Sequence, residues 1–142
     1  MILDSTYLLP LAGIAIDTNL LGAILNGKAN MKLEDISISL IFVLELQAKI
    51  AKLKVPVSTV IKAIEFIMRA FNVVSFYKPE VVRVSHELGE YIPDYIDCVI
   101  IATAIVLKED LVTEDTITHK RKKIVEGRYK VSVLRYRDLI KT

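Results

Sequence analysis

An α/β fold, built as a three-layer α/β/α sandwich with a mostly parallel central sheet, is predicted by three observations on the sequence. Short β-branched or apolar runs alternate with longer helix-like segments along the chain. The 142 residues suit one compact domain with a real core, and no repeat or low-complexity stretch divides them. Hydrophobic residues make up 53% of the chain, which excludes a disordered protein. We therefore predict a single domain over residues 1–142.

The first half of the chain is expected to hold two strands and three helices. A helix beginning at Asn19 ends at the helix-stop pair Asn26-Gly27. Ser39 is placed to cap the next helix, which should end before Pro56 because proline disfavours helix at the residue preceding it. Ser58 then begins another helix. The expected elements are strands over 1–3 and 36–39 and helices over 19–25, 40–54 and 59–70.

The second half continues the alternation. Pro79 suits the first turn of a helix that Gly89 closes, and Pro93-Asp94 opens another helix, with Asp94 as its cap. The expected elements are strands over 73–76, 111–113 and 131–136 and helices over 79–88 and 95–106. In such a sheet, ligands bind outside the carboxyl ends of the strands.

Composition and charge limit the class of protein. The mean hydropathy of +0.44 is high, yet the longest apolar runs, 98–107 and 40–44, are too short to span a bilayer. The first residues lack a basic segment, so no signal peptide is expected. Cys98 is the only cysteine, which excludes an internal disulfide and favours a reducing, cytoplasmic location. The apolar excess, as in the helix over 60–71, instead predicts a homodimer.

Four acidic residues stand where apolar segments end or turn. They are Asp4, Glu45, Asp97 and Asp115. An acid inside an apolar segment is costly to bury unless its charge is compensated. Asp4 and Asp115 directly follow expected strands, while Glu45 and Asp97 lie in the first two turns of expected helices. Carboxylates that converge in this way predict a bound divalent cation, Mg²⁺ or Mn²⁺.

The motifs around these acids resemble those of the PIN domain family. They are Asp4-Ser5-Thr6, Phe42-Val-Leu-Glu45-Leu, Tyr95-Ile-Asp97-Cys-Val-Ile-Ile-Ala-Thr-Ala and Leu111-Val-Thr113-Glu-Asp115, in the family's order. The run from Asp4 to Pro10 also looks like an archaeal subgroup. The resemblance implies a metal-dependent endoribonuclease that hydrolyses RNA phosphodiester bonds. It also implies that the chain is the toxin of a VapBC-type toxin–antitoxin pair, with an antitoxin as its partner.

Each motif residue then receives a role. Asp4, Asp97 and Asp115 are the expected metal ligands, directly or through water, because clustered carboxylates repel one another until a cation binds. Glu45 would orient a water near the metal or act as general base. Thr6 and Thr113 would hold a water or a phosphate oxygen by hydrogen bonds.

Alternatives remain at several of these positions. Asp17-Thr18-Asn19 is an equally good copy of the first motif, so Asp17 is the rival of Asp4. Asp4 and Asp115 would also serve as simple helix N-caps. For the whole chain, the alternatives are a non-catalytic PIN-like domain that binds RNA or a partner, and a receiver-like α/β domain. The receiver reading lacks a clear phospho-acceptor aspartate and late lysine.

The net charge of +2 does not by itself indicate nucleic-acid binding. The positive charge is nevertheless concentrated after Asp115, in the basic cluster Lys120, Arg121, Lys122 and Lys123. A cluster of this kind is commonly a solvated helix face, and its alternative role is contact with the RNA backbone.

Overall fold

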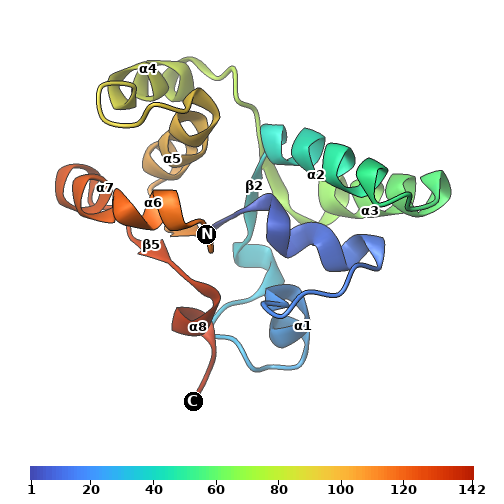
Figure 1. Ribbon diagram of the computed structural model, residues 1–142. Coiled ribbons are helices and arrows are strands. Elements are labelled where there is room, and N and C mark those ends of the chain that lie inside the picture. The colour runs from blue at the N-terminus through green and yellow to red at the C-terminus, as the bar shows by residue number, and fades with distance from the viewer.

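A five-stranded, fully parallel sheet lies at the centre of the computed structural model, which describes residues 1–142 (Figure 1). The strands are β1 (Ile2–Leu3), β2 (Ser37–Ser39), β3 (Asn72–Val74), β4 (Leu111–Val112) and β5 (Val133–Leu134). Their order in space is β3-β2-β1-β4-β5. The predicted α/β/α architecture with a parallel sheet is therefore confirmed.

Helices surround the sheet in pairs. Figure 1 shows α2 beside α3, α4 beside α5, and α6 beside α7. The 3₁₀ helix η1 packs against α2. Helices α1 and α8 lie at the end of the molecule that is far from α4 and α5 (Figure 1). The helical segments are η1 (Ser5–Ala12), α1 (Leu20–Leu25), η2 (Leu33–Asp35), α2 (Leu40–Lys52), α3 (Val57–Ala70), α4 (Pro79–Leu88), α5 (Tyr95–Leu107), α6 (Thr116–Lys120), α7 (Lys122–Tyr129) and α8 (Tyr136–Leu139).

The central strand β1 is short but completely buried. Ile2 and Leu3 have no exposed surface, and Ile2 pairs with Ser37 of β2 on one side and Leu111 of β4 on the other. Parallel strands covered by helices on both faces carry apolar residues in succession rather than in alternation. This explains why the apolar pair before Asp4 forms the middle of the sheet.

The strand order creates a switch point between β1 and β4. From β1 the chain proceeds to β2 and then β3 on one side, whereas from β4 it proceeds to β5 on the other side. The connections that leave β1 and β4 therefore run in opposite directions, and a crevice opens at the carboxyl ends of these two strands. Asp4 follows β1 directly, and Thr113 follows β4 directly. The fold thus places both predicted motifs at the same crevice.

Helix α5 is apolar on all sides and lies within the protein. All residues from Cys98 to Ala104 are buried, and α5 packs along α4. A helix that is hydrophobic all round is stable only when protein surrounds it. Because the body of α5 is fixed in this way, Asp97 in its first turn has a well-defined position.

Several element boundaries differ from those predicted. Helix α2 ends at Lys52 rather than Lys54, because Lys54 adopts a positive φ of 56° in the turn before Pro56. Helix α3 begins at Val57, with Pro56 rather than Ser58 at the N-cap position. Ser39 does occupy the N-cap position of α2, but its side chain accepts no capping hydrogen bond and its Oγ is buried without a partner.

Other differences concern the strands and segments with no predicted structure. Strand β3 covers 72–74 instead of 73–76, and β5 is confined to Val133–Leu134. After β5, the Arg135 N–H donates to Asp138 Oδ2 over 2.8 Å, and this bond starts the short helix α8 where an extended strand was expected. The 3₁₀ helix η1 and the helix α7 were not predicted. No helix has the length and apolar character that crossing a membrane requires.

Candidate active site

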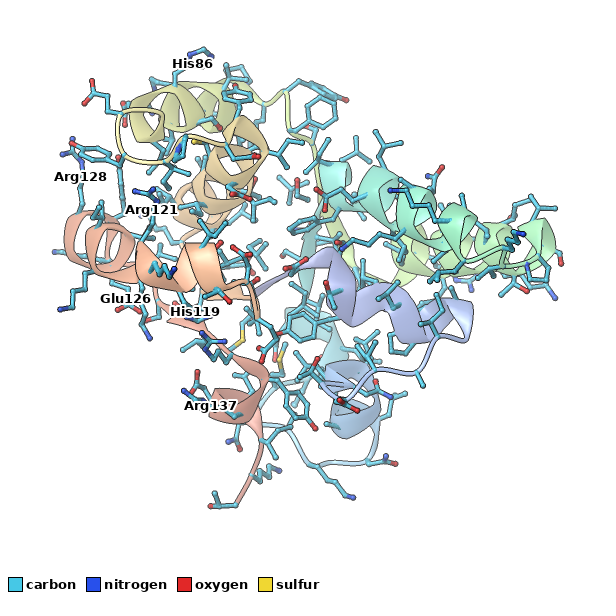
Figure 2. The ribbon with its side chains drawn as sticks, viewed as in Figure 1. His86, His119, Arg121, Glu126, Arg128 and Arg137 are labelled. Carbon is cyan, nitrogen blue, oxygen red and sulfur yellow. The ribbon has the colours of Figure 1, made fainter.

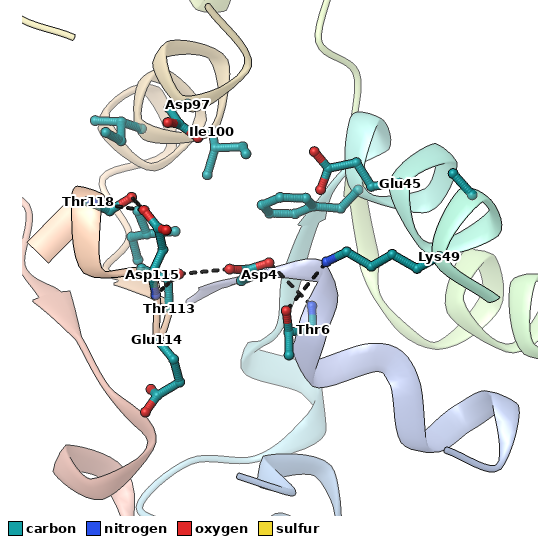
Figure 3. Close-up of a pocket in the computed structure, with 14 residues that line it drawn as sticks. Asp4, Thr6, Glu45, Lys49, Asp97, Ile100, Thr113, Glu114, Asp115 and Thr118 are labelled. Carbon is teal, nitrogen blue, oxygen red and sulfur yellow. Dashed lines mark hydrogen bonds between the residues drawn. The ribbon is translucent and has the colours of Figure 1, made fainter. Parts of the chain in front are cut away.

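All four predicted acids line a single cavity of about 590 Å³ at the carboxyl edge of the sheet (Figure 3). Each comes from a different segment, since Asp4 follows β1, Glu45 lies on α2, Asp97 begins α5 and Asp115 precedes α6. The two predicted threonines, Thr6 and Thr113, line the same cavity. The structure therefore brings together every residue that the sequence assigned to the catalytic set, and we call this cavity the acidic pocket.

Asp4 is held by hydrogen bonds from residues that follow the strands β1 and β4. Its Oδ2 accepts from the Thr113 hydroxyl over 2.7 Å. Its Oδ1 accepts from the Thr6 backbone N–H and from the Ser5 hydroxyl, each over 3.2 Å. Asp4 is thus also the N-cap of η1, as the simpler interpretation proposed. The cap fixes the carboxylate at the pocket wall, so the two roles are compatible.

Asp115 likewise caps a helix and lines the pocket. Its Oδ2 accepts from the Thr118 N–H over 2.8 Å and from the Thr118 hydroxyl over 2.7 Å, which caps α6. Its own N–H donates to Thr113 Oγ1 over 3.0 Å. Thr113 therefore contacts both acids of the switch point, whereas Oδ1 of Asp115 has no hydrogen-bond partner.

Asp97 is the acid with the least support from hydrogen-bond donors. Its backbone N–H donates to the capping carboxylate of Asp94 over 3.1 Å, but no group donates to its own carboxylate. Burial raises the pKa of Asp97 to about 6 from its usual 3.8, and repulsion from Asp94, Asp115, Glu45 and Asp4 adds to the rise. A negative charge at Asp97 is therefore unfavourable in the protein by itself, and a bound cation would stabilise it.

Glu45 is half-buried on α2 and faces the pocket rather than open solvent. Its Oε2 accepts from the Ser5 hydroxyl over 3.2 Å. The same hydroxyl faces Asp4 at an equal distance, and its single proton serves one of the two carboxylates at a time. Ser5 is fully buried and so links the first motif to the second.

The donor set of the pocket fits a divalent cation, but only one that keeps water ligands. No three carboxylate, histidine or cysteine side chains are placed to hold one ion together. Mg²⁺ usually retains several waters and takes one or two carboxylates from the protein. The acidic pocket supplies hard oxygen donors and one carboxylate, Asp97, that lacks any other partner, so a hydrated Mg²⁺ or Mn²⁺ suits it.

Asp17, the rival of Asp4, lies outside the pocket. It is exposed in the turn before α1, makes no side-chain hydrogen bond and does not line the cavity. The neighbouring Asn19 accepts from the Gly22 N–H over 2.9 Å and caps α1. The Asp17-Thr18-Asn19 segment therefore serves as a helix start, and Asp4 is the first-motif aspartate that faces the other acids.

None of the four residues of the basic cluster lines the pocket. Arg121 donates through Nη1 to the Tyr91 carbonyl over 2.7 Å, and Lys122 forms an ion pair with Glu126 at 3.6 Å. Figure 2 shows Arg121 directed from the start of α7 toward the segment after α4. Lys120 and Lys123 are exposed without a protein partner, so only these two offer free positive charge.

Two pocket residues, Lys49 and Glu114, and the fully buried Ser5 beside the pocket were not predicted to be functional. Ser5 belongs to the first motif, whereas Lys49 belongs to none of the four motifs. Glu114 lines the pocket between Thr113 and Asp115, and its Oε2 accepts from the Tyr7 hydroxyl over 2.6 Å and from the Tyr136 N–H over 2.9 Å. These contacts join segments distant in sequence, and no local pattern predicts them.

Comparison with known proteins gives one family match to the sequence. The family profile described as PIN domain matches residues 14–124, which include Glu45, Asp97, Asp115 and Asp17 and begin after Asp4. None of the curated proteins compared with the chain matches it. The evidence for Asp4 therefore comes from the structure, which places it directly after the central strand β1 and in the wall of the pocket.

Solved structures share the fold at low sequence identity. FitAB bound to an IR36 DNA fragment has a TM-score of 0.66 at 20% identity, covering 96% of this chain and 95% of that chain. FitAcB from Neisseria gonorrhoeae has a TM-score of 0.63 at 19% identity, covering 95% and 96%. VapBC2 from Rickettsia felis, bound to a DNA fragment from its promoter, has a TM-score of 0.58 at 19% identity, covering 94% and 96%.

Proposed function

Because this chain belongs to the PIN domain family, we propose that it is a metal-dependent endoribonuclease that hydrolyses RNA phosphodiester bonds in the acidic pocket. The observation that carries the proposal is the meeting of four carboxylates from four separate segments in one cavity at the sheet's switch point. A cavity of this kind has little use in a purely structural domain, because crowded carboxylates oppose folding when no cation compensates them.

Asp4, Asp97 and Asp115 are the residues that we assign to Mg²⁺ or Mn²⁺. When bound, such an ion lowers the pKa of a water molecule and neutralises charge on the phosphate. Asp97 contributes a carboxylate without competing donors, and Asp115 contributes Oδ1, which no other group uses. Asp4 keeps its orientation through Thr113 and the backbone of Thr6. Asp4 and Asp115 therefore hold their oxygens in place before an ion arrives.

Glu45 is assigned to the attacking water. It is half-buried, lies opposite Asp115 across the pocket and takes part in no ion pair (Figure 3). A carboxylate in that position accepts a proton from a water or holds the water in line with the phosphate. Ser5 orients Glu45 by its hydrogen bond, while Thr6 offers a hydroxyl at the pocket wall for a water or a phosphate oxygen.

The setting of this activity is proposed from the relatives. FitAB, FitAcB and VapBC2 share the fold, and a toxin–antitoxin complex from Klebsiella pneumoniae does so with a TM-score of 0.58. We infer that this chain is the toxin half of such a pair and that an antitoxin protein is its partner in the cell. RNA is the proposed substrate.

A second candidate is a PIN-like domain that binds RNA or a protein partner without cutting. The observation in its favour is that no three acids are positioned to hold one ion directly. The two candidates differ in one measurable property, because only the nuclease requires a divalent cation to change its substrate covalently.

A cleavage assay with paired variants tests the proposal. A labelled single-stranded RNA is incubated with the purified protein in EDTA, in Mg²⁺ and in Mn²⁺. We expect cleavage only with a cation, loss of cleavage in Asp4→Asn and Asp97→Asn, and full activity in Asp17→Asn, which changes an exposed aspartate outside the pocket. Binding of RNA without cleavage under every condition would favour the second candidate. Activity that disappears in Asp17→Asn but survives in Asp4→Asn would mean that Asp17, not Asp4, is the metal ligand.

A further inference from the structure

Lys49 is the only basic residue that lines the acidic pocket. It lies on α2 one helical turn after Glu45, and this spacing places both side chains on the same face of the helix. Figure 3 shows its side chain extending from α2 across the pocket wall toward Asp4 and Thr6. The question is what this single positively charged side chain does among the carboxylates of the pocket.

The Lys49 ammonium makes contact with hydroxyl groups only. It donates to Ser5 Oγ over 2.9 Å and to Thr6 Oγ1 over 3.5 Å. No carboxylate oxygen lies within ion-pair distance of it, although Asp4 and Glu45 line the same cavity. The positive charge is therefore not neutralised by a direct partner, and one of the three ammonium N–H groups remains free.

The rest of the pocket strengthens the need for this charge. Five acidic residues line the pocket, and all but Glu114 direct their carboxylates toward it (Figure 3): Asp4, Glu45, Asp97, Glu114 and Asp115. A phosphodiester that enters such a cavity is repelled unless cations compensate. The predicted basic cluster does not reach the pocket, and Arg121 and Lys122 are engaged elsewhere. Lys49 is thus the one side chain of the protein that offers positive charge inside the pocket.

We propose that Lys49 binds a phosphate of the RNA in the acidic pocket and so positions the phosphodiester next to the carboxylates. The inference rests on the proposed ribonuclease function and adds a substrate-binding residue to it. The flexible four-carbon stem of lysine lets the ammonium move from the Thr6 hydroxyl, its longer contact, to a phosphate oxygen. Ser5 and Thr6 hold the ammonium at the pocket wall until substrate arrives.

The competing explanation is structural, in which Lys49 only fastens α2 to η1. The two explanations predict different effects of charge. A fastening role depends on hydrogen bonds to two hydroxyls and changes thermal stability, whereas phosphate binding depends on positive charge and changes RNA affinity and its response to salt. Lys49 is exposed, so its substitution leaves the core intact.

The test measures binding of a fluorescent single-stranded RNA in EDTA by anisotropy, in an Asp97→Asn background. Lys49→Met and Lys49→Gln remove the charge, Lys49→Arg keeps it, and Lys52→Met is the matched control on the same helix, exposed and outside the pocket. We expect the two neutral variants to weaken binding about tenfold and to reduce the slope of log K against log salt by about 0.7. Lys49→Arg and Lys52→Met should stay within about threefold of the parent.

Two outcomes would overturn the proposal. One is equal loss of affinity in Lys49→Met and Lys52→Met, and the other is unchanged RNA affinity in both neutral variants, with or without a lower melting temperature. Titration of the RNA-free, wild-type protein and of Lys49→Met with Mn²⁺ separates this inference from the proposed function. Absence of Mn²⁺ binding in the wild type counts against the nuclease, while RNA binding still decides the role of Lys49.

Discussion

Thr113 donates a 2.7 Å hydrogen bond to the carboxylate of Asp4, a residue 109 positions earlier in the chain. The same threonine oxygen accepts the backbone N–H of Asp115. One buried side chain therefore fixes the geometry between the ends of β1 and β4, the two strands that flank the switch point. The Thr-x-Asp motif has a structural meaning beyond supplying an acid, because its threonine aligns the other aspartate.

Replacement of Thr113 by valine should disturb this alignment without creating a large cavity. Valine keeps the shape but removes the hydroxyl, so Asp4 loses a donor and the Asp115 N–H loses an acceptor. We expect a loss of about 1–3 kcal/mol in the free energy of unfolding and a marked fall in cleavage rate. Urea denaturation and the RNA assay measure both. Thr113→Ser, which keeps the hydroxyl, should retain most of each, and an equal defect in Thr113→Ser would contradict the alignment role.

Asp97→Asn should abolish cleavage and leave the protein folded. The pKa of Asp97 is raised to about 6 from 3.8, so between these pH values the folded protein holds a proton that the unfolded chain has released. Stability of the metal-free wild type should therefore fall as the pH rises through this window, and Asp97→Asn should lack that fall. Melting temperatures from pH 4 to pH 7 in EDTA measure the difference. A lower melting temperature of the variant at pH 7 would instead indicate a structural role for the charge.

The same pKa predicts how cation binding depends on pH. Protons and cations compete for the Asp97 carboxylate, so Mn²⁺ affinity should be nearly constant above about pH 7. Below about pH 6, affinity should fall, approaching tenfold per pH unit for one displaced proton. Calorimetric titration at several pH values measures this trend. In Asp97→Asn, whose amide does not titrate, binding should be weaker and should lose this component of the pH dependence.

Glu114 should stabilise the pocket through its bond to Tyr7. The hydroxyl of the buried Tyr7 donates to Glu114 over 2.6 Å, and burial together with this carboxylate raises the tyrosine's pKa above its usual value. Glu114→Ala leaves that hydroxyl unpaired and should cost about 1–3 kcal/mol. The double variant Glu114→Ala/Tyr7→Phe should lose less than the sum of the two single variants, as measured by urea denaturation. Strict additivity would mean that the two groups do not interact energetically.

The homodimer remains a prediction, and α3 carries the exposed apolar side chains that we expect at its interface. Val57 is 73% exposed, and Ile61 and Met68, further along the same helix, are each 50% exposed. Apolar side chains exposed in a row commonly mark a contact surface. Sedimentation at tens of micromolar should give a dimer, and Ile61→Glu should shift it toward monomer. A monomeric wild type would leave this apolar surface for a different partner.

The parts predictable from sequence were those governed by local pattern. Strand–helix alternation and the positions of Asp4 and Asp115 after apolar pairs sufficed to predict a parallel sheet and acids at its carboxyl edge. The choice between Asp4 and Asp17 needed the structure, because both aspartates precede helical segments and only the structure shows that Asp4 lines the pocket while Asp17 lies exposed outside it.

The remaining parts depend on contacts between distant segments. No local sequence pattern marks Lys49 or Glu114 as functional. Lys49 gains its role from contact with Ser5, and Glu114 from contact with Tyr7 and Tyr136, all of which are distant in the sequence. The boundary of α2 was missed for a different reason. A lysine rarely adopts positive φ, so Lys54 gives no sign in the sequence that the helix ends two residues before it.

The order of the strands in the sheet also determines how much of the chain must be synthesised before the pocket can form. Strand β1 leaves the ribosome first, yet its neighbour β4 follows only after β2, β3 and the helices around them. Closing the long intervening loop is the slow, entropically unfavourable part of folding such a topology. A nascent chain that ends before Leu111 lacks one wall of the pocket altogether. Under the proposed function, the chain therefore has no complete site until Asp115 has been synthesised and β4 has joined the sheet.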